Sequence, residues 1–337
     1  MRQVVIKAPG ELELTQSATE PEVAEDQVLL KPLVVGICGS DVHAFEGKHP
    51  FVRLPFVPGH EIAAEVMGLG AKVSGVAIGD RVAVEPNVAC GLCEACLSGK
   101  YNICERVVVV GSRLPGGMAD LVAVRADRLH IVPKSMSDAE AALIEPLATA
   151  SHAVRVAGPL EGRRVAILGA GTIGLLTLLA ARAAGASVVV STDLRASKRE
   201  RAMRLGAIAG LDPSEPTAVD QIKEALGGRP DVTFDCVAIQ ASMDQAVALA
   251  RKGGMVVVVG IAVAPVLVAL PAVQNGEVRI EGSNMYVGTD MVRALSLIEA
   301  HAIPVLEIIT QTYPLDRVLE AFKAAGEGDQ VKVQLRV

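Results

Sequence analysis

The sequence of 337 residues contains no tryptophan, and aromatic residues make up only 2% of it, although 51% of the residues are hydrophobic. The core must therefore be built from Val, Ile, Leu and Ala. Long aliphatic runs of this kind are typical of parallel sheets that are covered on both faces. The length predicts two domains, because single cores stop growing at roughly 250 to 300 residues.

The chain also lacks an excess of positive charge. Its formal net charge is −6 and its isoelectric point is about 5.6. Binding to nucleic acid or to an anionic membrane surface needs a cationic field, so the composition argues against both partners. The N-terminal segment has neither the pattern of a secretory leader nor the composition of a transit peptide, which predicts a cytoplasmic protein.

One uncharged stretch, residues 253–274, is long enough to span a membrane by length alone. Pro265, Pro271 and the β-branched run 256–259 favour instead a buried strand, a turn and a second strand. We therefore expect no membrane-spanning segment.

The texture of the sequence changes along the chain. About the first 140 residues combine Gly and Pro with short Val and Leu runs, which is typical of an all-β region. From about Leu160 onward, aliphatic strands alternate with helical segments, and this alternation predicts a parallel sheet with helices on both sides. The expected strands are 164–168, 187–191, 232–237 and 255–260, and the expected helices are 173–184, 195–205, 243–249, 291–300 and 315–325.

Four of the six cysteines fall in the segment CGLCEACLSGKYNIC. Short turns can bring four thiolates to the corners of a tetrahedron, the geometry that Zn²⁺ prefers in closed structural sites. Disulfide bonds are less favoured, because neighbours two residues apart rarely reach bridging geometry. The spacing predicts a structural zinc in a lobe over about residues 88–106, held by Cys90, Cys93, Cys96 and Cys104.

Two cysteines lie outside this lobe. Cys236 lies in the apolar segment VTFDCVA and is interpreted as a buried, inert thiol. Cys38 lies in GICGSDVHAFEG, and His60 and Glu61 follow in PGHE. These three side chains would give the number of ligands that a catalytic zinc keeps while a fourth position stays open. Each residue taken alone is more often structural, and spacing does not prove that Cys38 and His60 meet.

A glycine-rich motif follows the first aliphatic strand of the second region. Residues 165–174 read VAILGAGTIG, so that Gly169, Gly171 and Gly174 join a strand to a helix. This context is typical of a dinucleotide site, since the turn allows close approach of a pyrophosphate and the helix N-terminus favours the anion.

Asp193 ends the next strand, nineteen residues after Gly174. An acid at this place accepts hydrogen bonds from the ribose hydroxyls, and its charge repels a 2′-phosphate, which favours NAD over NADP. Arg195, Lys198 and Arg199 follow and could compensate a phosphate, although a solvated helix face is the simpler interpretation of Arg199. The predicted cofactor-binding residues are Gly169, Gly171, Thr172, Ile173, Gly174, Asp193, Lys198 and Val259.

The order of these motifs resembles that of the zinc-dependent medium-chain alcohol dehydrogenases over essentially the whole chain. Within them, GICGSDVH and Glu145-Pro146-Leu147 are forms usual in the polyol and sorbitol dehydrogenase branch. The resemblance implies an α/β plus all-β fold, with a GroES-like catalytic domain, a Rossmann domain and a cleft between them. The implied domain bounds are 1–145 with 286–337 for the catalytic domain and 146–285 for the NAD-binding domain.

The resemblance also implies roles for individual residues. Cys38, His60 and Glu61 would hold a catalytic zinc. Glu145 would be a further zinc ligand or a carboxylate joined to zinc through water, unless it serves only as an acid at a helix start. Asp41 would orient His60, as is common for a metal-bound imidazole.

Further roles concern proton and cofactor. Ser40 and His43 would form a proton relay, and Thr149 would border the nicotinamide. The remaining histidines have no match in the family and are interpreted as surface or packing residues: His49, His130, His152 and His301.

The implied reaction is the reversible oxidation of a secondary alcohol, diol or sugar alcohol by NAD, with two zinc ions per subunit of a homotetramer or a dimer. Two departures weaken the polyol assignment: Ala44 replaces a tyrosine of sorbitol-type enzymes, and Met285 replaces an arginine before Tyr286. Threonine, butanediol or a simpler apolar alcohol therefore remain alternatives. A zinc ribbon that binds nucleic acid and a noncatalytic NAD-binding protein are rival interpretations, disfavoured by the acidic balance and the complete set of site residues.

Overall fold

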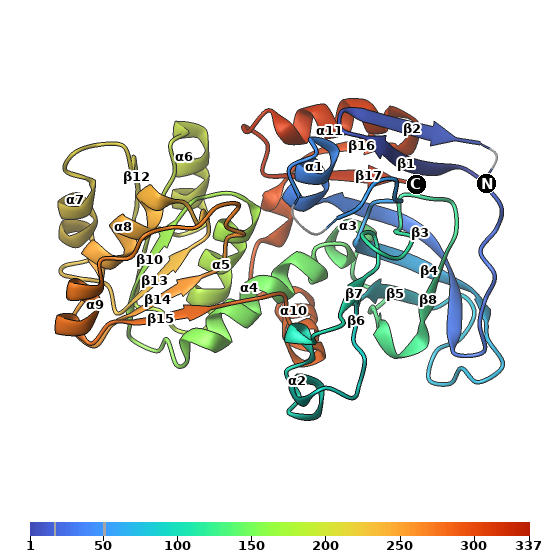
Figure 1. Ribbon diagram of the computed structural model, residues 1–337, viewed down its shortest axis with the longest axis horizontal. Helices are drawn as coiled ribbons and strands as arrows, with labels where there is room; N and C mark the ends of the chain where they lie inside the picture. The colour runs from blue at the N-terminus through green and yellow to red at the C-terminus, as the bar shows by residue number, and fades with distance from the viewer. Residues whose placement is uncertain (17, 50–51) are drawn as a thin grey trace. The chain divides into compact units, whose positions relative to one another are not determined.

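The computed structural model describes residues 1–16, 18–49 and 52–337. These divide into two compact units, each with its own hydrophobic core (Figure 1). The first unit comprises Met1–Glu145, Val287–His301 and Val305–Val337, and the second comprises Pro146–Tyr286 and Ala302–Pro304.

The first unit is built around a mostly antiparallel sheet. Seven strands form this sheet in the order β16-β17-β3-β4-β5-β9, with β8 paired to β3. Two further pairs, β1-β2 and β6-β7, stand apart from it. The strands are β1 (Gln3–Ala8), β2 (Glu11–Thr15), β3 (Gln27–Ile37), β4 (Glu61–Leu69), β5 (Arg81–Val84), β6 (Asn87–Val88), β7 (Val108–Val109), β8 (Val122–Arg125), β9 (Leu129–Ile131), β16 (Ile309–Pro314) and β17 (Lys332–Arg336).

Short helices and 3₁₀ turns accompany the strands of the first unit. The rings of Phe45 and Phe322 meet edge to face at 5.6 Å, so two of the few aromatic residues join α1 to α11. The helices are α1 (Gly39–Phe45), α2 (Glu94–Leu97), α3 (Asp138–Ala141), α10 (Gly288–Glu299) and α11 (Val318–Gly326), with 3₁₀ turns at Tyr101–Ile103, Ala126–Arg128, Val305–Ile308 and Leu315–Arg317.

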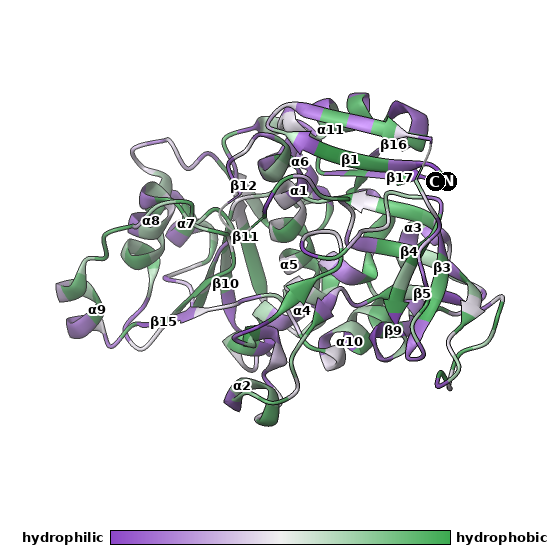
Figure 2. Cartoon of the chain, turned by 45° about the vertical axis from the view of Figure 1, so that its right-hand side comes forward, coloured by the Kyte–Doolittle hydropathy of each residue, from purple (hydrophilic) through white to green (hydrophobic). Residues whose placement is uncertain are grey.

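The second unit is a parallel sheet of six strands in the order β12-β11-β10-β13-β14-β15. The chain starts in the middle of the sheet and winds outward in both directions, which defines a doubly wound fold. Its strands β10 and β11 are mostly hydrophobic (Figure 2), with Arg164 at the start of one and Ser191 and Thr192 at the end of the other, as expected for a sheet covered on both faces. The strands are β10 (Arg164–Leu168), β11 (Val188–Thr192), β12 (Ala209–Leu211), β13 (Val232–Asp235), β14 (Met255–Val258) and β15 (Arg279–Gly282).

Helices alternate with these strands, as the sequence predicts. The second strand expected within 253–274 is wrong, because that stretch ends in the helix α9. Pro271 lies in the first turn of α9, where its missing N–H has no helical partner to lose. The helices are α4 (Ile144–Ala157), which begins in the first unit, and α5 (Thr172–Ala183), α6 (Ala196–Arg204), α7 (Ala218–Ala225), α8 (Gln240–Leu249) and α9 (Leu270–Gly276).

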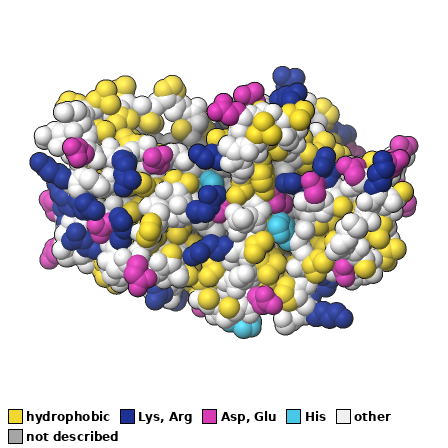
Figure 3. Space-filling view, turned by 90° about the horizontal axis from the view of Figure 1, so that it is seen from below, with side chains coloured by type: hydrophobic (Ala, Val, Ile, Leu, Met, Phe, Trp, Pro, Cys, Tyr) yellow, Lys and Arg dark blue, Asp and Glu magenta, His cyan; other side chains and the backbone are white. Residues whose placement is uncertain are grey.

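The predicted combination of an all-β region and an α/β region is thus confirmed. The face seen in Figure 3 carries basic and acidic side chains interspersed with hydrophobic ones. Across the described part of the chain, every helix is too short or too polar to cross a membrane.

Candidate active site and metal centres

The pairing of two strands brings Cys38, His60 and Glu61 together. Strands β3 and β4 are antiparallel, with Gly36 opposite Glu61. Because Cys38 lies just past the end of β3 and His60 just before the start of β4, the two residues come side by side. Candidate ligand atoms of the three residues all lie within 4.8 Å of one another. A thiol, an imidazole and a carboxyl group at this spacing fit a zinc ion that keeps one position open.

Asp41, in the first turn of α1, supports two of these residues. Its side chain is buried, and Oδ2 accepts a hydrogen bond of 2.9 Å from the Cys38 backbone N–H. Its Oδ1 lies 3.7 Å from Nδ1 of His60, which leaves Nε2 of the ring available to a metal. Burial alone would lower the pKa of His60, but the Asp41 carboxylate and the Cys38 thiol outweigh burial and raise this pKa well above its usual value.

Glu61 is paired with Lys332 in the interior of the protein. Both side chains are 1% exposed, and Nζ of Lys332 donates to Oε1 and Oε2 of Glu61 at 2.5 and 2.8 Å. Nζ also donates to the carbonyl oxygen of Ile37 at 3.0 Å. The carboxylate lies over Gly36, where a Cβ would come within 1.7 Å of Oε2, so only glycine leaves room for it.

Lys332 was not anticipated from the sequence. Alternation in KVQLR, the segment of β17, suggests a lysine on a solvent face, whereas the first four residues of this strand are all buried. Burial alone would lower the pKa of Lys332, but Glu61 and Cys38 outweigh burial and raise it, so the lysine stays charged.

Glu145 lies in the first turn of α4 and is 8% exposed. Its negative charge raises the pKa of His60, although less than Asp41 and Cys38 do. The same charge also raises the pKa of Lys332. The structure therefore brings Glu145 near the Cys38 cluster, at the distance over which charges interact.

The other predicted catalytic residues lie on two helices. Ser40 and His43 are three residues apart on α1, and so share one face of that helix, with Ser40 half-buried and His43 exposed. Thr149 lies on α4, one turn after Glu145, and is half-buried.

The four cysteines of the lobe form a second cluster, with all sulfur atoms within 4.8 Å of one another. Sγ of Cys96 lies 3.9 Å from that of Cys90 and 3.5 Å from that of Cys93. Zn–S bonds of about 2.3 Å give a tetrahedron with edges of about 3.8 Å, so this spacing fits zinc and is too long for a disulfide. Backbone N–H groups of Leu92 and Cys93 lower the pKa of the Cys90 thiol to about 6, whereas burial and the neighbouring Cys93 thiol raise the pKa of Cys96 to about 12, so the thiolate is favoured at only part of the cluster before a metal binds.

A buried polar network ties the lobe to the rest of the first unit. The Glu85 carboxylate, 2% exposed, accepts hydrogen bonds from Tyr101 Oη at 2.6 Å and Arg128 Nη1 at 3.0 Å, and lies 3.1 Å from His130 Nε2. Tyr101 Oη in turn accepts from the backbone N–H of Gly288. Burial and the Glu85 carboxylate raise the pKa of Tyr101 to about 12. His130 is therefore a specific partner of a buried carboxylate, rather than the surface or packing residue that we expected.

In the second unit, the glycine motif joins β10 to α5. Gly171 is the N-cap of α5, and a Cβ there would meet no atom within 4 Å, which leaves room for an approaching group. At Gly174 a Cβ would lie 1.8 Å from the carbonyl oxygen of Gly169, so glycine is needed for the helix to pack on the turn. Thr172 and Ile173 form the first turn of α5. This arrangement fits a dinucleotide pyrophosphate at the helix N-terminus.

Asp193 lies just past β11, at the carboxyl edge of the sheet. Its Oδ2 accepts a hydrogen bond of 3.0 Å from the backbone N–H of Ala170, and Oδ1 accepts one of 3.0 Å from that of Arg195. The carboxylate is thereby held beside the glycine motif, where an acid can meet the ribose hydroxyls. Lys198 is half-buried on α6, and Val259 lies just past β14 with its N–H 2.8 Å from the carbonyl oxygen of Asp235.

Arg199 corrects one expectation. Its guanidinium donates to the carbonyl oxygens of Asp193 and Leu194 and forms an ion pair with Asp212 at 2.9 Å. The interpretation as a solvated side chain is wrong, because this guanidinium closes the turn after β11 through three partners. An arginine so engaged is not free to compensate a 2′-phosphate.

Two polar side chains, Cys236 and its neighbour Asp235, lie at the carboxyl end of β13. Burial raises the pKa of the Cys236 thiol to about 12, so the thiol stays protonated. Asp235 was missed by sequence reasoning, although its place at the end of a predicted strand was a signal. Its buried carboxylate accepts from the N–H groups of Val237 and Ala238 and from the Ser242 hydroxyl, which shapes the loop at the carboxyl end of β13.

Comparison with known proteins places the chain in a family. It matches the model described as Alcohol dehydrogenase GroES-like domain over residues 24–134, and that described as Zinc-binding dehydrogenase over residues 172–300. Sorbitol dehydrogenase of Bombyx mori is 36% identical over 325 residues, which cover 94% of this chain and 93% of that protein. Sorbitol dehydrogenase of Bacillus subtilis (strain 168) is 32% identical over 331 residues, which cover 96% and 93%. The chain belongs to the zinc-dependent medium-chain alcohol dehydrogenases.

Solved structures of this family share the fold. A protein of Sinorhizobium meliloti 1021, described as a zinc-binding dehydrogenase and bound to NADP, superposes with a TM-score of 0.94 at 31% identity, covering 100% of this chain and 99% of that one. The 2R,3R-butanediol dehydrogenase of Bacillus subtilis superposes with a TM-score of 0.92 at 29% identity, covering 100% and 99%.

These matches confirm the GroES-like plus Rossmann fold and the sorbitol dehydrogenase branch of the family. The protein is a zinc-dependent dehydrogenase of alcohols or polyols, with zinc and NAD(P) as its cofactors. One departure from the sorbitol pattern is visible in this dehydrogenase: Ala44 is 3% exposed and packs in the core of the first unit, so it offers no hydrogen bond to a substrate.

Proposed function

We propose that this dehydrogenase oxidises a secondary alcohol of a diol, polyol or sugar alcohol reversibly, with NAD as the hydride acceptor. The convergence of Cys38, His60 and Glu61, supported by Asp41, carries this proposal. These three residues hold the catalytic zinc, with Glu145 as a direct ligand or joined to it through water. The structural zinc is held by Cys90, Cys93, Cys96 and Cys104.

The chemistry divides between metal and protein. Zinc bound at the Cys38 cluster supplies a Lewis acid, which lowers the pKa of a substrate hydroxyl by several units. Asp41 fixes the ring of His60, and Lys332 neutralises the charge of Glu61 inside the protein. Ser40 and His43 form a relay for the released proton, with the ribose of the cofactor between them, and the exposed His43 can deliver the proton to water. Thr149 borders the nicotinamide.

The preference for NAD over NADP rests on Asp193. Its carboxylate and a 2′-phosphate about 4 Å away would repel each other by the order of several kcal/mol at an effective dielectric near 20. In Asp193→Ser, the ratio of kcat/KM for NAD to that for NADP should fall roughly 10- to 100-fold, because the repulsion is removed. Asp212→Asn is a control, since this carboxylate pairs with Arg199 in the same region. A ratio that moves equally in both variants contradicts the assignment.

The decisive experiment is NAD-linked activity over a panel of sorbitol, xylitol, 2R,3R-butanediol, threonine and 2-propanol. Activity on the polyols supports the proposal. Preference for butanediol or threonine supports the second candidate, which the fold similarity to a butanediol dehydrogenase favours. Full activity of the Cys38→Ala variant would contradict both candidate functions.

Three further proposals concern organisation. The domain bounds are 1–145 with 286–337 for the catalytic domain and 146–285 for the NAD-binding domain.

The protein assembles as a homotetramer, or as a dimer, through the second unit, where Ile261, Val263, Leu267 and Leu270 are each more than half exposed. It works in the cytoplasm, since six cysteines without a disulfide bond suit a reducing compartment. Light scattering tests the assembly, and Leu267→Asp should reduce the molar mass of the oligomer.

A further inference from the structure

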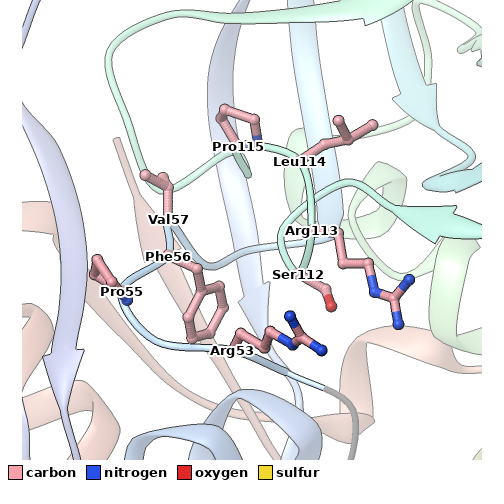
Figure 4. Close-up of a pocket in the computed structure, with 8 residues that line it drawn as sticks. All are labelled: Arg53, Pro55, Phe56, Val57, Ser112, Arg113, Leu114 and Pro115. Atoms are coloured by element: carbon pink, nitrogen blue, oxygen red, sulfur yellow. The ribbon is translucent and has the colours of Figure 1, made fainter.

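A cavity of about 590 Å³ lies within the first unit, and two short segments form its walls (Figure 4). The first wall comprises residues 53–57, and the second residues 112–115. This volume is in the range of pockets that bind small molecules.

Backbone hydrogen bonds clamp the two walls together. The N–H of Gly116 donates to the carbonyl oxygen of Val57 at 3.0 Å, and that of Met118 donates to Pro58 at 3.1 Å. The second wall is itself a tight loop, in which the N–H of Gly111 donates to the carbonyl oxygen of Leu114 at 2.8 Å. The cavity is therefore a built feature of the fold.

The cavity adjoins the Cys38 cluster. Val57 precedes His60 by three residues, so their Cα atoms are at most roughly 11 Å apart. Gly111, directly before the second wall, is close to the same segment, since a Cβ there would lie 3.0 Å from the backbone nitrogen of His60. The cavity thus lies beside the segment that carries His60.

Two exposed arginines line the cavity. Figure 4 shows the guanidinium groups of Arg53 and Arg113 on one side of it, with the hydroxyl of Ser112 between them. Among the residues that the structure describes, neither arginine has an ion-pair partner, and no carboxylate lines the cavity. Arginines elsewhere in the chain do have such partners: Arg128, Arg199 and Arg251 pair with Glu85, Asp212 and Asp231.

Two unpaired cations, one on each wall, repel each other until an anion lies between them. A guanidinium presents a planar fork of N–H donors that matches the oxygens of a carboxylate or a phosphate. The opposite part of the cavity is apolar, with Phe56, Val57 and Leu114, and suits a carbon chain.

We propose that this cavity binds an anionic group of the substrate, a carboxylate or a phosphate monoester, while the reacting hydroxyl lies at the Cys38 cluster. The preferred substrates are then sugar acids or phosphorylated sugar alcohols rather than neutral polyols. This inference rests on the proposed function, because it assumes that the Cys38 cluster is the reacting centre.

Steady-state kinetics of the zinc-loaded enzyme test this inference. Sorbitol, gluconate and sorbitol 6-phosphate are each tested as the substrate, with NAD as the hydride acceptor. The measured quantity is the ratio of kcat/KM for each anion to kcat/KM for sorbitol. We expect ratios above one that fall with added NaCl. Arg53→Met and Arg113→Met should each lower the ratio for the preferred anion roughly 10- to 100-fold, mainly through KM. A lower ratio for gluconate in these variants indicates a carboxylate site, and a lower ratio for sorbitol 6-phosphate indicates a phosphate site.

Arg293→Met is the matched control, because Arg293 is an exposed arginine on α10 outside the cavity and its loss changes the net charge equally. Arg53→Lys keeps the charge but loses the fork, and should recover only part of the ratio. A preference for sorbitol, with ratios in the two methionine variants no lower than in Arg293→Met, would overturn the inference and leave the proposed function intact.

Calorimetric titration with gluconate and with inorganic phosphate decides the inference if no alcohol of the panel is oxidised. Binding to the zinc-loaded protein that weakens in the Arg53→Met/Arg113→Met double variant supports an anion site even then. No binding, or equal binding to the double variant and to Arg293→Met, refutes it.

Discussion

The two candidate metal clusters of the first unit draw their side chains from very different distances along the chain. All cysteines of the lobe lie within fifteen residues. Their own turns shape the site, as when the N–H of Cys90 donates to Sγ of Cys104 at 3.3 Å. The Cys38 cluster is assembled instead by strand pairing, and its support Lys332 comes from β17. A local cluster can be recognised from spacing, whereas an assembled one needs the register of a sheet.

The clusters differ also in what surrounds them. The lobe contains only a helix of four residues and a 3₁₀ turn of three, and no residue of that helix is buried. The Cys38 cluster lies at the ends of β3 and β4, two interior strands of a seven-stranded sheet that buries a large core. We infer that metal shapes the lobe, while the sheet shapes the Cys38 cluster without it.

The largest expected effect separates the two clusters directly. Cys38→Ser should lower kcat by roughly 10³-fold or more, because a zinc site that loses its thiolate loses several kcal/mol of electrophilic stabilisation. The melting temperature should change little, since the sheet does not depend on this metal. Activity, zinc content and thermal melting of one preparation measure all three quantities.

Cys96→Ser is the matched variant in the lobe. It should remove the other zinc, with a marked loss of thermal stability and a faster proteolytic cleavage between residues 88 and 106. Equal melting temperatures of the two variants would contradict the distinction between a lobe that needs metal and a sheet that does not.

The next effect concerns Lys332, the buried cation of the Cys38 cluster. In the metal-free protein, Lys332→Met leaves the Glu61 carboxylate buried without a partner, which costs about 3–5 kcal/mol of unfolding free energy. Zinc should restore part of this loss, because a bound dication compensates the same carboxylate. Thermal melting of wild type and Lys332→Met, once in chelator and once with zinc, measures the loss of stability without and with the metal.

Lys332→Arg keeps the charge and serves as the control. Equal losses for Lys332→Met with and without zinc would show that the lysine acts through packing alone. The d–d spectrum of the Co²⁺-substituted protein provides a second readout, since a Glu61 carboxylate released from Lys332 changes the ligand field.

The limits of sequence reasoning follow from the same contrast. The glycine motif, Asp193 and the lobe could be predicted because their spacings are local, and the strand 164–168 was predicted with its observed bounds. Lys332 could not, because its partner Glu61 lies 271 residues away, and the two meet only because β3 pairs with both β17 and β4. The network of Glu85, likewise, joins residues that are separated by as much as 187 positions.

This network gives a smaller prediction that links the lobe to the sheet. Tyr101→Phe removes the hydrogen bond to Glu85 and the acceptor for the N–H of Gly288, which should cost about 1–3 kcal/mol. Tyr313→Phe is the control, because that tyrosine is partly exposed and its hydroxyl donates to Gln311 of its own strand. A loss no larger in Tyr101→Phe than in the control would mean that the network does not anchor the lobe.

The smallest effect provides the reference for an ion pair without metal. Asp231, at the start of β13, accepts from the backbone N–H of Arg164 at 2.9 Å and from Nε of Arg251 at 2.6 Å. Burial alone would raise the pKa of Asp231, but these two donors outweigh it and lower the pKa below its usual value. Asp231→Asn should therefore lower the unfolding free energy at pH 7 by about 1–2 kcal/mol, less than the loss of Lys332.

The sign of its pH dependence follows from the lowered pKa. A carboxylate with a depressed folded pKa contributes stability above its unfolded pKa, near about 4, and loses this contribution as the pH falls through the folded value. The difference in melting temperature between wild type and Asp231→Asn, measured in chelator, should be greatest near pH 7 and vanish at acid pH. If the difference in melting temperature stayed the same at acid pH, Asp231 would act through packing and not through its charge. Asp231 could then not serve as the reference for the charge effect expected at Lys332.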